Sequence, residues 1–248
     1  MLRLDWLIAR PVAHRGLHDA QKGIIENTSS AFRAAIAGRY GIECDLQISA
    51  DGEAMVHHDD ALGRLTEGSD RLDAVTAADL KRVSYKATSD RMIALGELCE
   101  LVAGRATLVV ELKSRYDGDR RLVRRAAKIL SGYQGPAALM SFDPAQIAAL
   151  REIAPALPRG IVAERYYRHH EWEGLSAASK RAMAYFTHAP RTRPQFIAYA
   201  VRDLPAAIPM LARAILRRPL LTWTVRSTGD RQKAERYADQ MIFEGFRP

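Results

Sequence analysis

The sequence predicts an α/β protein folded as a single (β/α)8 TIM barrel, somewhat distorted, because three of its features agree on that fold. Eight short runs of apolar and β-branched residues recur along 248 residues, and most are separated by segments with helical periodicity. Neither a GxGxxG motif nor a P-loop follows the first run, which argues against an open dinucleotide-binding sheet. No linker-like tract divides the chain, so one domain is expected over residues 1–248.

The strands of this barrel are predicted from runs of apolar residues that end in turn or helix signals. They cover residues 11–16, 40–49, 106–114, 136–143, 159–164, 195–203, 219–226 and 239–246. After the second strand, the turn at residues 50–53 and the run at 55–59 predict a short returning strand. A β-hairpin should therefore project at the end of strand two.

Several helices between these strands begin at residues that commonly cap a helix. Asn27 or Thr28 precedes one helical pattern, and Thr76 starts another with the spacing of a capping box. Asp143 is followed by Pro144, which is the usual order of an N-cap and the first helical residue. These signals place helices between the predicted strands, as the barrel requires.

The positive charge of the chain does not by itself indicate a nucleic-acid partner. The sequence has 37 Lys and Arg against 29 Asp and Glu, a formal net charge of +8. Its densest basic stretch, residues 120–128, alternates with apolar residues and lacks interleaved aromatics, so it predicts an amphipathic helix with a solvated basic face. We therefore expect no nucleic-acid partner.

The sequence also bears on the compartment. No apolar run approaches the ~18 residues that span a bilayer, and the N-terminus does not resemble a signal peptide. Cys44 and Cys99 lack metal-ligand spacing and form no disulfide framework. A cytoplasmic protein without a transmembrane segment is expected, and its assembly into a homo-oligomer is left open.

Charged residues stand where barrel strands should be apolar, near the strands' C-terminal ends. Glu43 and Asp45 are two residues apart, as are Glu111 and Lys113, so each pair should face one side of its strand. The C-terminal ends of barrel strands meet at one face, where active sites form. Three carboxylates directed into one space would repel each other unless a cation lies between them. Oxygen ligands of this kind favour one Mg²⁺ or Ca²⁺ ion, and the alternative is salt bridging of Glu43 or Glu111 to Lys113 and Arg15.

Two histidines complete the set of reactive side chains. His14 ends the first strand, and either His57 or His58 follows the hairpin strand, since neighbouring residues should face opposite ways. An imidazole titrates near neutrality and can move protons during a reaction. A divalent cation, an Arg, a Lys and two histidines are suited to hydrolysis of a phosphate ester.

In order along the chain, these residues lie within HRG (14–16), ENT (26–28), ECDLQISADGEAMVHHDDALGRLT (43–66) and VVELKS (109–114). In this arrangement the chain resembles the glycerophosphodiester phosphodiesterase family, with a weaker match through SFD (141–143) and TWTV (222–225). The resemblance implies a distorted TIM barrel, a divalent cation, and hydrolysis of glycerophosphodiesters to glycerol 3-phosphate and an alcohol.

The resemblance also assigns roles to individual residues. It implies that His14 and His58 are the catalytic acid/base pair, and it selects His58 over His57 because His58 and Asp59 match the family's HD motif. The implied cation ligands are Glu43, Asp45 and Glu111. The implied substrate-binding or supporting residues are Arg15, Lys113, Glu26, Asn27 and Trp223.

Two segments depart from the family pattern. The last strand, YADQMIFEGFRP, lacks the family's usual Thr-Asp pair. Residues 165–174 are rich in aromatic and charged residues, and we interpret them as a solvated loop or a substrate-facing lid rather than a second metal site at His169, His170, Glu171 and Glu173. The alternatives to the implied activity are cleavage of larger lipids, as by a lysophospholipase D, and a non-catalytic barrel that binds phosphorylated ligands.

Overall fold

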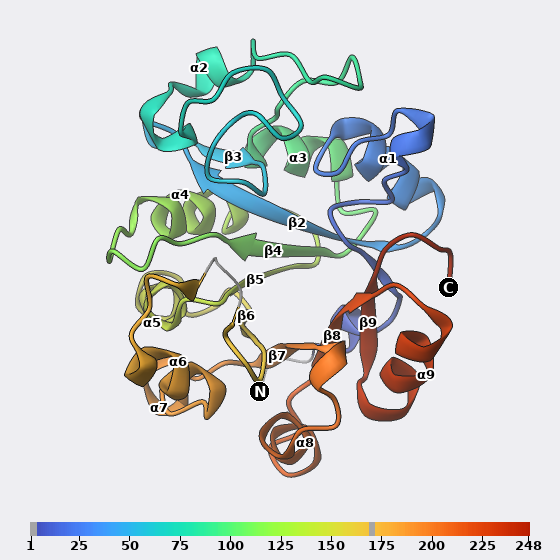
Figure 1. Ribbon diagram of the computed structural model, residues 1–248, viewed down its shortest axis with the longest axis vertical. Helices are drawn as coiled ribbons and strands as arrows, with labels where there is room; N and C mark the ends of the chain where they lie inside the picture. Colours follow the sequence, from blue (N-terminus) through green and yellow to red (C-terminus); the bar gives the residue numbers. More distant parts are fainter. Residues whose placement is uncertain (1–3, 169–171) are drawn as a thin grey trace.

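The computed structural model describes residues 4–168 and 172–248 and shows a closed barrel of eight parallel strands. The strands follow the order β1-β9-β8-β7-β6-β5-β4-β2, and parallel pairing of β1 with β2 closes the ring. A further strand, β3, pairs antiparallel with β2. Helices surround the ring (Figure 1). The predicted (β/α)8 barrel with a hairpin after its second strand is confirmed.

All the predicted strands form, and the helices lie between them. The strands are β1 (Val12–Ala13), β2 (Gly41–Ile48), β3 (Ala54–Val56), β4 (Leu108–Leu112), β5 (Ala137–Ser141), β6 (Arg159–Ala163), β7 (Phe196–Ala200), β8 (Leu220–Val225) and β9 (Gln240–Phe243). The α-helices are α1 (Ser29–Ala37), α2 (Ala77–Leu80), α3 (Leu95–Val102), α4 (Arg121–Leu130), α5 (Pro144–Ile153), α6 (Ala177–Ala184), α7 (Ala189–Thr192), α8 (Ala207–Ala214) and α9 (Thr228–Tyr237).

The inside of the barrel is filled with side chains from alternate strand positions. Val109, Val162 and Phe196 pack together there, and Leu7, from the segment before β1, packs into the same cluster. Gly160 makes room for this packing, because a Cβ at that position would lie 2.3 Å from the Phe196 ring. The barrel is thus a packed core, and space for a ligand remains at one end.

The helix starts agree with the sequence signals, with one difference of detail. The Asp143 carboxylate accepts a hydrogen bond from the Ala145 N–H, and Thr76 accepts one from the Asp79 N–H. Thr28 is the N-cap of α1, but its hydroxyl donates to the Ile25 carbonyl and does not cap the helix. Asn27 has a left-handed backbone with φ 57° and belongs to the site described below.

The basic stretch forms α4 with one apolar face buried, as predicted. Leu122, Val123 and Ala126 pack against the barrel, whereas Arg124 and Lys128 are exposed. Within residues 4–168 and 172–248, the structure has no helix that combines the length and the apolar character required to span a bilayer.

Candidate active site

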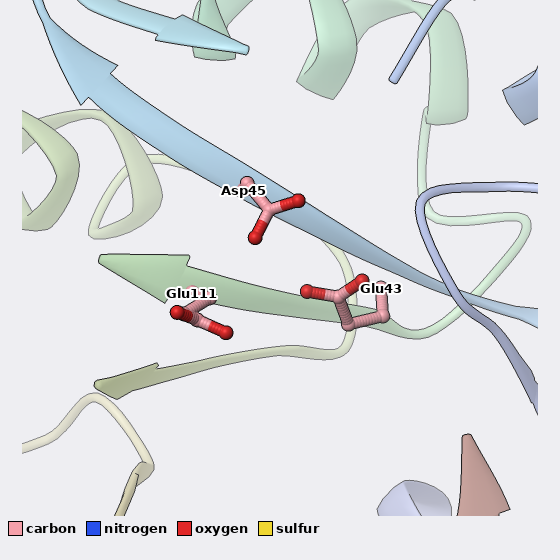
Figure 2. Close-up of side chains that lie close together, drawn as sticks. All are labelled: Glu43, Asp45 and Glu111. Carbon is pink, nitrogen blue, oxygen red and sulfur yellow. The ribbon is translucent and has the colours of Figure 1, made fainter. Parts of the chain in front are cut away.

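The three predicted carboxylates come together on neighbouring strands. Asp45 of β2 is in register with Glu111 of β4, and Glu43 lies two residues before Asp45 on the same side. Carboxylate oxygens of the three residues lie within 4.8 Å of one another, and all three side chains are buried (Figure 2). The parallel register of two strands is therefore enough to bring the three acids together.

Burial and mutual repulsion give these carboxyl groups unequal affinities for protons. Burial, together with the charges of Asp45 and Glu111, raises the pKa of Glu43 well above its ordinary value. Burial opposes ionisation of Asp45 too, but Lys113 and Arg15 hold the pKa of Asp45 well below its usual range. The group therefore has a strong electrostatic demand for a further positive charge beside Glu43.

Two cationic side chains meet part of this demand. Lys113 Nζ lies 2.9 Å from Asp45 Oδ1 and 2.7 Å from Glu111 Oε1, and Arg15 Nε lies 3.2 Å from Asp45 Oδ2. Of the ion pairs anticipated as the alternative, that between Glu111 and Lys113 is present, whereas the pairs of Asp45 were not anticipated. In the described part of the chain, however, no Lys or Arg side chain lies within 4.0 Å of Glu43, which accepts the Arg15 backbone N–H at 3.0 Å. The three oxygen donors could therefore hold a metal ion, and they fit a hard divalent cation.

Glu26 and Asn27 support this group from behind. The Asn27 amide donates to Asp45 Oδ2 at 2.9 Å, and its carbonyl oxygen accepts the Asp45 backbone N–H at 3.3 Å. Glu26 accepts hydrogen bonds from Arg15 and Arg64, both at 2.7 Å. Both residues therefore orient charged side chains of the site.

His14 is held by a residue that the sequence interpretation missed. Its Nδ1 lies 2.5 Å from the Glu244 carboxylate, and its Nε2 lies 3.9 Å from Glu43. Burial lowers the pKa of His14, and the bond to Glu244 opposes that effect. Glu244 also accepts from Arg226 Nε at 2.6 Å. The sequence signal that could have identified Glu244 is its place directly after the last strand. The segment there lacks the Thr-Asp pair that the resembled family usually has.

The two adjacent histidines lie in different environments. His58 lines a cavity that also contains His14, called the central cavity below, and its Nδ1 lies 2.8 Å from the Asp59 carboxylate. His57 is 2% exposed, its Nδ1 lies 3.0 Å from the Asp59 carbonyl oxygen, and it is not among the residues that line that cavity. The structure thus separates the two imidazoles in the way that the alternation predicts.

The central cavity has a volume of about 270 Å³ and two unlike walls. One wall carries the charged residues already described, which are His14, Arg15, Glu43, His58, Glu111, Lys113 and Arg226. The other is aromatic, because Phe142 packs against Trp223 and Trp172 with ring centroids 5.4 and 4.8 Å apart. Trp223 lies on the cavity wall, where it was expected, but Phe142 and Trp172 were not anticipated.

The aromatic wall contains a buried carboxylate. Glu164 accepts a hydrogen bond from Trp172 Nε1 at 3.0 Å and forms an ion pair with Arg202. Trp172 belongs to the segment that we interpreted as a loop or lid, and its side chain forms part of the wall. Three residues of the alternative second metal site, His169, His170 and Glu171, lie outside the described residues.

A larger groove of about 680 Å³ adjoins the cavity. The two spaces share His58, Glu111 and Lys113 on the charged side, together with Phe142 and Trp172. The remaining lining of the groove is mixed, since it includes the apolar Leu62 and Leu175 together with the charged Asp60, Arg64 and Arg115. A molecule bound across the charged side chains therefore has space in two directions.

Comparisons with known proteins agree on one family. The model of the glycerophosphoryl diester phosphodiesterase family matches residues 14–245. A glycerophosphodiester phosphodiesterase of Caldanaerobacter subterraneus is 30% identical over 162 residues, covering 61% of this chain and 65% of that protein. Bovine glycerophosphodiester phosphodiesterase 1 is 40% identical over 75 residues, covering 29% of this chain and 22% of that protein. The chain thus spans less than two thirds of the length of these relatives.

Solved structures share the fold at lower identity. An Oleispira antarctica phosphodiesterase in complex with the product sn-glycerol-3-phosphate aligns with a TM-score of 0.74 at 17% identity, covering 94% of this chain and 91% of that chain. A glycerophosphodiester phosphodiesterase from Thermotoga maritima aligns with a TM-score of 0.68 at 22% identity, covering 94% of each chain. At these identities the likeness confirms the barrel alone.

The carboxylate group gives the first testable prediction. Mg²⁺ or Ca²⁺ added to chelator-treated protein should raise Tm, because an ion bound only by the folded state stabilises it, by about 3 kcal/mol at a hundredfold excess over Kd. Glu111→Gln should weaken the ion's apparent affinity about tenfold or more, as measured by calorimetry. Asp117→Asn, which removes an exposed carboxylate outside the triad, is the control. Equal ion affinity for the wild-type protein and Glu111→Gln would contradict the assignment.

Proposed function

The chain belongs to the glycerophosphoryl diester phosphodiesterase family, and on that premise we propose that it hydrolyses glycerophosphodiesters to glycerol 3-phosphate and an alcohol. One observation carries the proposal. A single cavity joins the imidazoles of His14 and His58, four Lys and Arg side chains, and two members of the three-carboxylate group. A binding barrel needs cations for a phosphate, but it has no use for two histidines placed to transfer protons.

The charged side chains divide into phosphate-binding and cation-binding groups. Arg15 and Lys113 both line the cavity, so they can donate to non-bridging phosphoryl oxygens while their partners Glu26 and Asp45 hold them in place. Glu43, Asp45 and Glu111 would hold one Mg²⁺ or Ca²⁺ ion. When bound, such an ion neutralises charge on the phosphoryl oxygens and lowers the barrier to nucleophilic attack.

We assign proton transfer to the two histidines that line the cavity. One takes a proton from the nucleophile as it attacks phosphorus, and the other gives a proton to the oxygen of the departing alcohol. Over the full reaction one water is consumed and one phosphorus–oxygen bond is exchanged. Glu244 fixes the ring of His14, and Asp59 fixes that of His58, so each imidazole presents Nε2 to the substrate.

The two connected spaces suit the two halves of a diester. The cavity of about 270 Å³ is sized for a small polar group such as glycerol against Trp223, and the larger groove can take the second alcohol. The apolar part of the groove lining also supports the second candidate, cleavage of larger lipids as by a lysophospholipase D, since an acyl chain would bury Leu62 and Leu175.

The compartment that we propose is the cytoplasm. It is supported by Cys44 and Cys99, which are buried free thiols in a chain without a disulfide among its described residues.

The proposed activity is tested with a panel of glycerophosphodiesters that differ in the alcohol, each assayed with Mg²⁺ and with Ca²⁺. Glycerol 3-phosphate should be released, and exhaustive chelation should abolish the release. A preference for lysophospholipids over water-soluble diesters would favour the second candidate. Binding of glycerophosphodiesters without turnover under every metal condition would instead identify a binding barrel.

The neighbouring histidines give a sharper prediction. His58→Ala should lower kcat by roughly two to four orders of magnitude, the usual effect of losing a general acid or base. His57→Ala should cost much less activity, and because His57 is buried, it should lower Tm instead. An inactive but folded His57→Ala beside a nearly normal His58→Ala would reverse the assignment.

A positioning role is predicted for Glu244. Glu244→Gln should lower kcat about tenfold or more with little change in KM, because His14 loses the carboxylate that orients its ring. Glu235→Gln, which changes an exposed acid on α9, is the matched control and should leave kcat unchanged. An unchanged kcat for Glu244→Gln would mean that the short contact has no role in turnover.

Substrates with different leaving groups can show which histidine is the general acid and which is the general base. A nitrophenolate departs without a proton, whereas an alkoxide such as that of choline does not. With a bis-nitrophenyl phosphodiester, the variant lacking the general acid should regain much of its activity, and the variant lacking the base should not. We expect the rescued variant to be His58→Ala, since His58 lies on the projecting hairpin beside the groove. Equal losses for His14→Ala and His58→Ala on both substrates would contradict divided roles.

A further inference from the structure

The end of the barrel opposite the active site carries a concentration of arginines. Turns from helices into β6, β7 and β8 place Arg159, Arg193, Arg217 and Arg218 at the N-terminal ends of three neighbouring strands. Arg151, in the last turn of α5, lies at the same end, because its Nη1 donates to the Arg191 carbonyl oxygen at 2.8 Å. These five residues, Arg151, Arg159, Arg193, Arg217 and Arg218, are called the basic rim below.

The basic rim is not neutralised by the protein. Within residues 4–168 and 172–248, the structure gives none of the five an ion pair. The guanidinium of Arg159, a residue that is 8% exposed, donates to the backbone carbonyl oxygens of Thr192 and Pro155. Burial lowers the pKa of Arg159, and the neighbouring charges of Arg151, Arg218 and Arg193 lower it further. The mutual repulsion of these cations would be relieved by an external anionic partner.

Arginines around the active site are arranged differently. Arg15, Arg64, Arg202 and Arg226 each form an ion pair with a glutamate or an aspartate. The positive surplus of the chain is therefore uneven, and part of it is concentrated at the opposite end.

Exposed aliphatic side chains accompany the cations. Ile215 and Leu216 are 70% and 60% exposed in the turn directly before Arg217, and Ile153, at the end of α5, is 42% exposed. Helices α5, α7 and α8, which lead into these turns, lie along the lower half of the barrel in Figure 1. Exposing large aliphatic side chains to water is energetically unfavourable. Such side chains also form no favourable contact with the phosphate backbone of a nucleic acid.

We propose that the basic rim, together with Ile153, Ile215 and Leu216, docks the protein onto an anionic phospholipid bilayer. Arg193 and Arg217, which are exposed, and the half-buried Arg218 would pair with lipid phosphates, whereas Arg159 is buried and adds positive charge from within. The aliphatic side chains would enter the boundary between headgroups and acyl chains. A nucleic acid would satisfy the arginines but would leave the aliphatic side chains in water. In this orientation the C-terminal strand ends face the aqueous phase, so the docked protein acts on dissolved substrates.

Flotation with vesicles tests the docking. The full chain should float with vesicles of equal parts phosphatidylcholine and phosphatidylglycerol, and it should not float with phosphatidylcholine alone. Arg217→Glu with Arg218→Glu should weaken binding at least about tenfold, because each surface cation contributes roughly fivefold. Arg33→Glu with Arg124→Glu is the control, since it makes the same change of charge on exposed residues of α1 and α4.

The aliphatic contribution is tested without a change of charge. Ile215→Ser with Leu216→Ser should also reduce flotation several-fold, and hydrolysis of a dissolved diester should be unchanged in every variant. Three results would overturn the proposal: no binding to anionic vesicles, equal loss in the control pair, or insensitivity to the serine variant combined with tight binding to duplex DNA. None of these results depends on whether the active site hydrolyses glycerophosphodiesters, so the two proposals fail separately.

Discussion

Electrostatic repulsion among three buried carboxylates is the constraint on which the rest of the site depends. Parallel register between β2 and β4 brings Asp45 opposite Glu111, and the alternation along β2 adds Glu43. A barrel interior cannot hold three ionised acids this close without compensating charge. Lys113 and Arg15 supply part of that charge from the adjoining positions, and both also face the cavity. The side chains that make the acids tolerable are therefore the same ones that are available to a phosphate.

Closure of the barrel supplies the second part of the site. Because β1 pairs with β9, residues 230 positions apart in sequence, His14 and Glu244, come into direct contact. The opposite face of the cavity is built from Phe142 after β5, Trp223 of β8 and Trp172. The Phe142 ring packs edge to face against Trp223 and tilted against Trp172. A charged wall and an aromatic wall thus face each other across one cavity, which suits a ligand with one anionic and one uncharged part.

Sequence reasoning succeeded where a residue's environment is set locally. Strand alternation is a property of a few consecutive residues, and it was sufficient to place Glu43 and Asp45 on one side and to separate His58 from His57. It could not identify Glu244, Phe142 or Trp172 as site residues. Their positions in the site depend on which strands become neighbours when the barrel closes. Thr28 shows a limit of a different kind. A correct N-cap position did not determine whether its hydroxyl would bond to the helix or, as here, to the Ile25 carbonyl oxygen.

Arginines at the two ends of the barrel differ in how many form ion pairs. This difference follows from where buried acids lie. At the C-terminal ends of the strands, buried acids demand cations, so the arginines there are held in ion pairs and their side chains have fixed directions. At the N-terminal ends Arg213 pairs with Asp239, but in the described chain no acid pairs with the basic rim, so the exposed Arg193 and Arg217 carry their charge at the surface. Net charge alone conceals this division, since a value of +8 would be the same if the cations were evenly spread. Under the two proposals made above, the paired cations bind a small anionic substrate and the unpaired cations contact a large anionic surface.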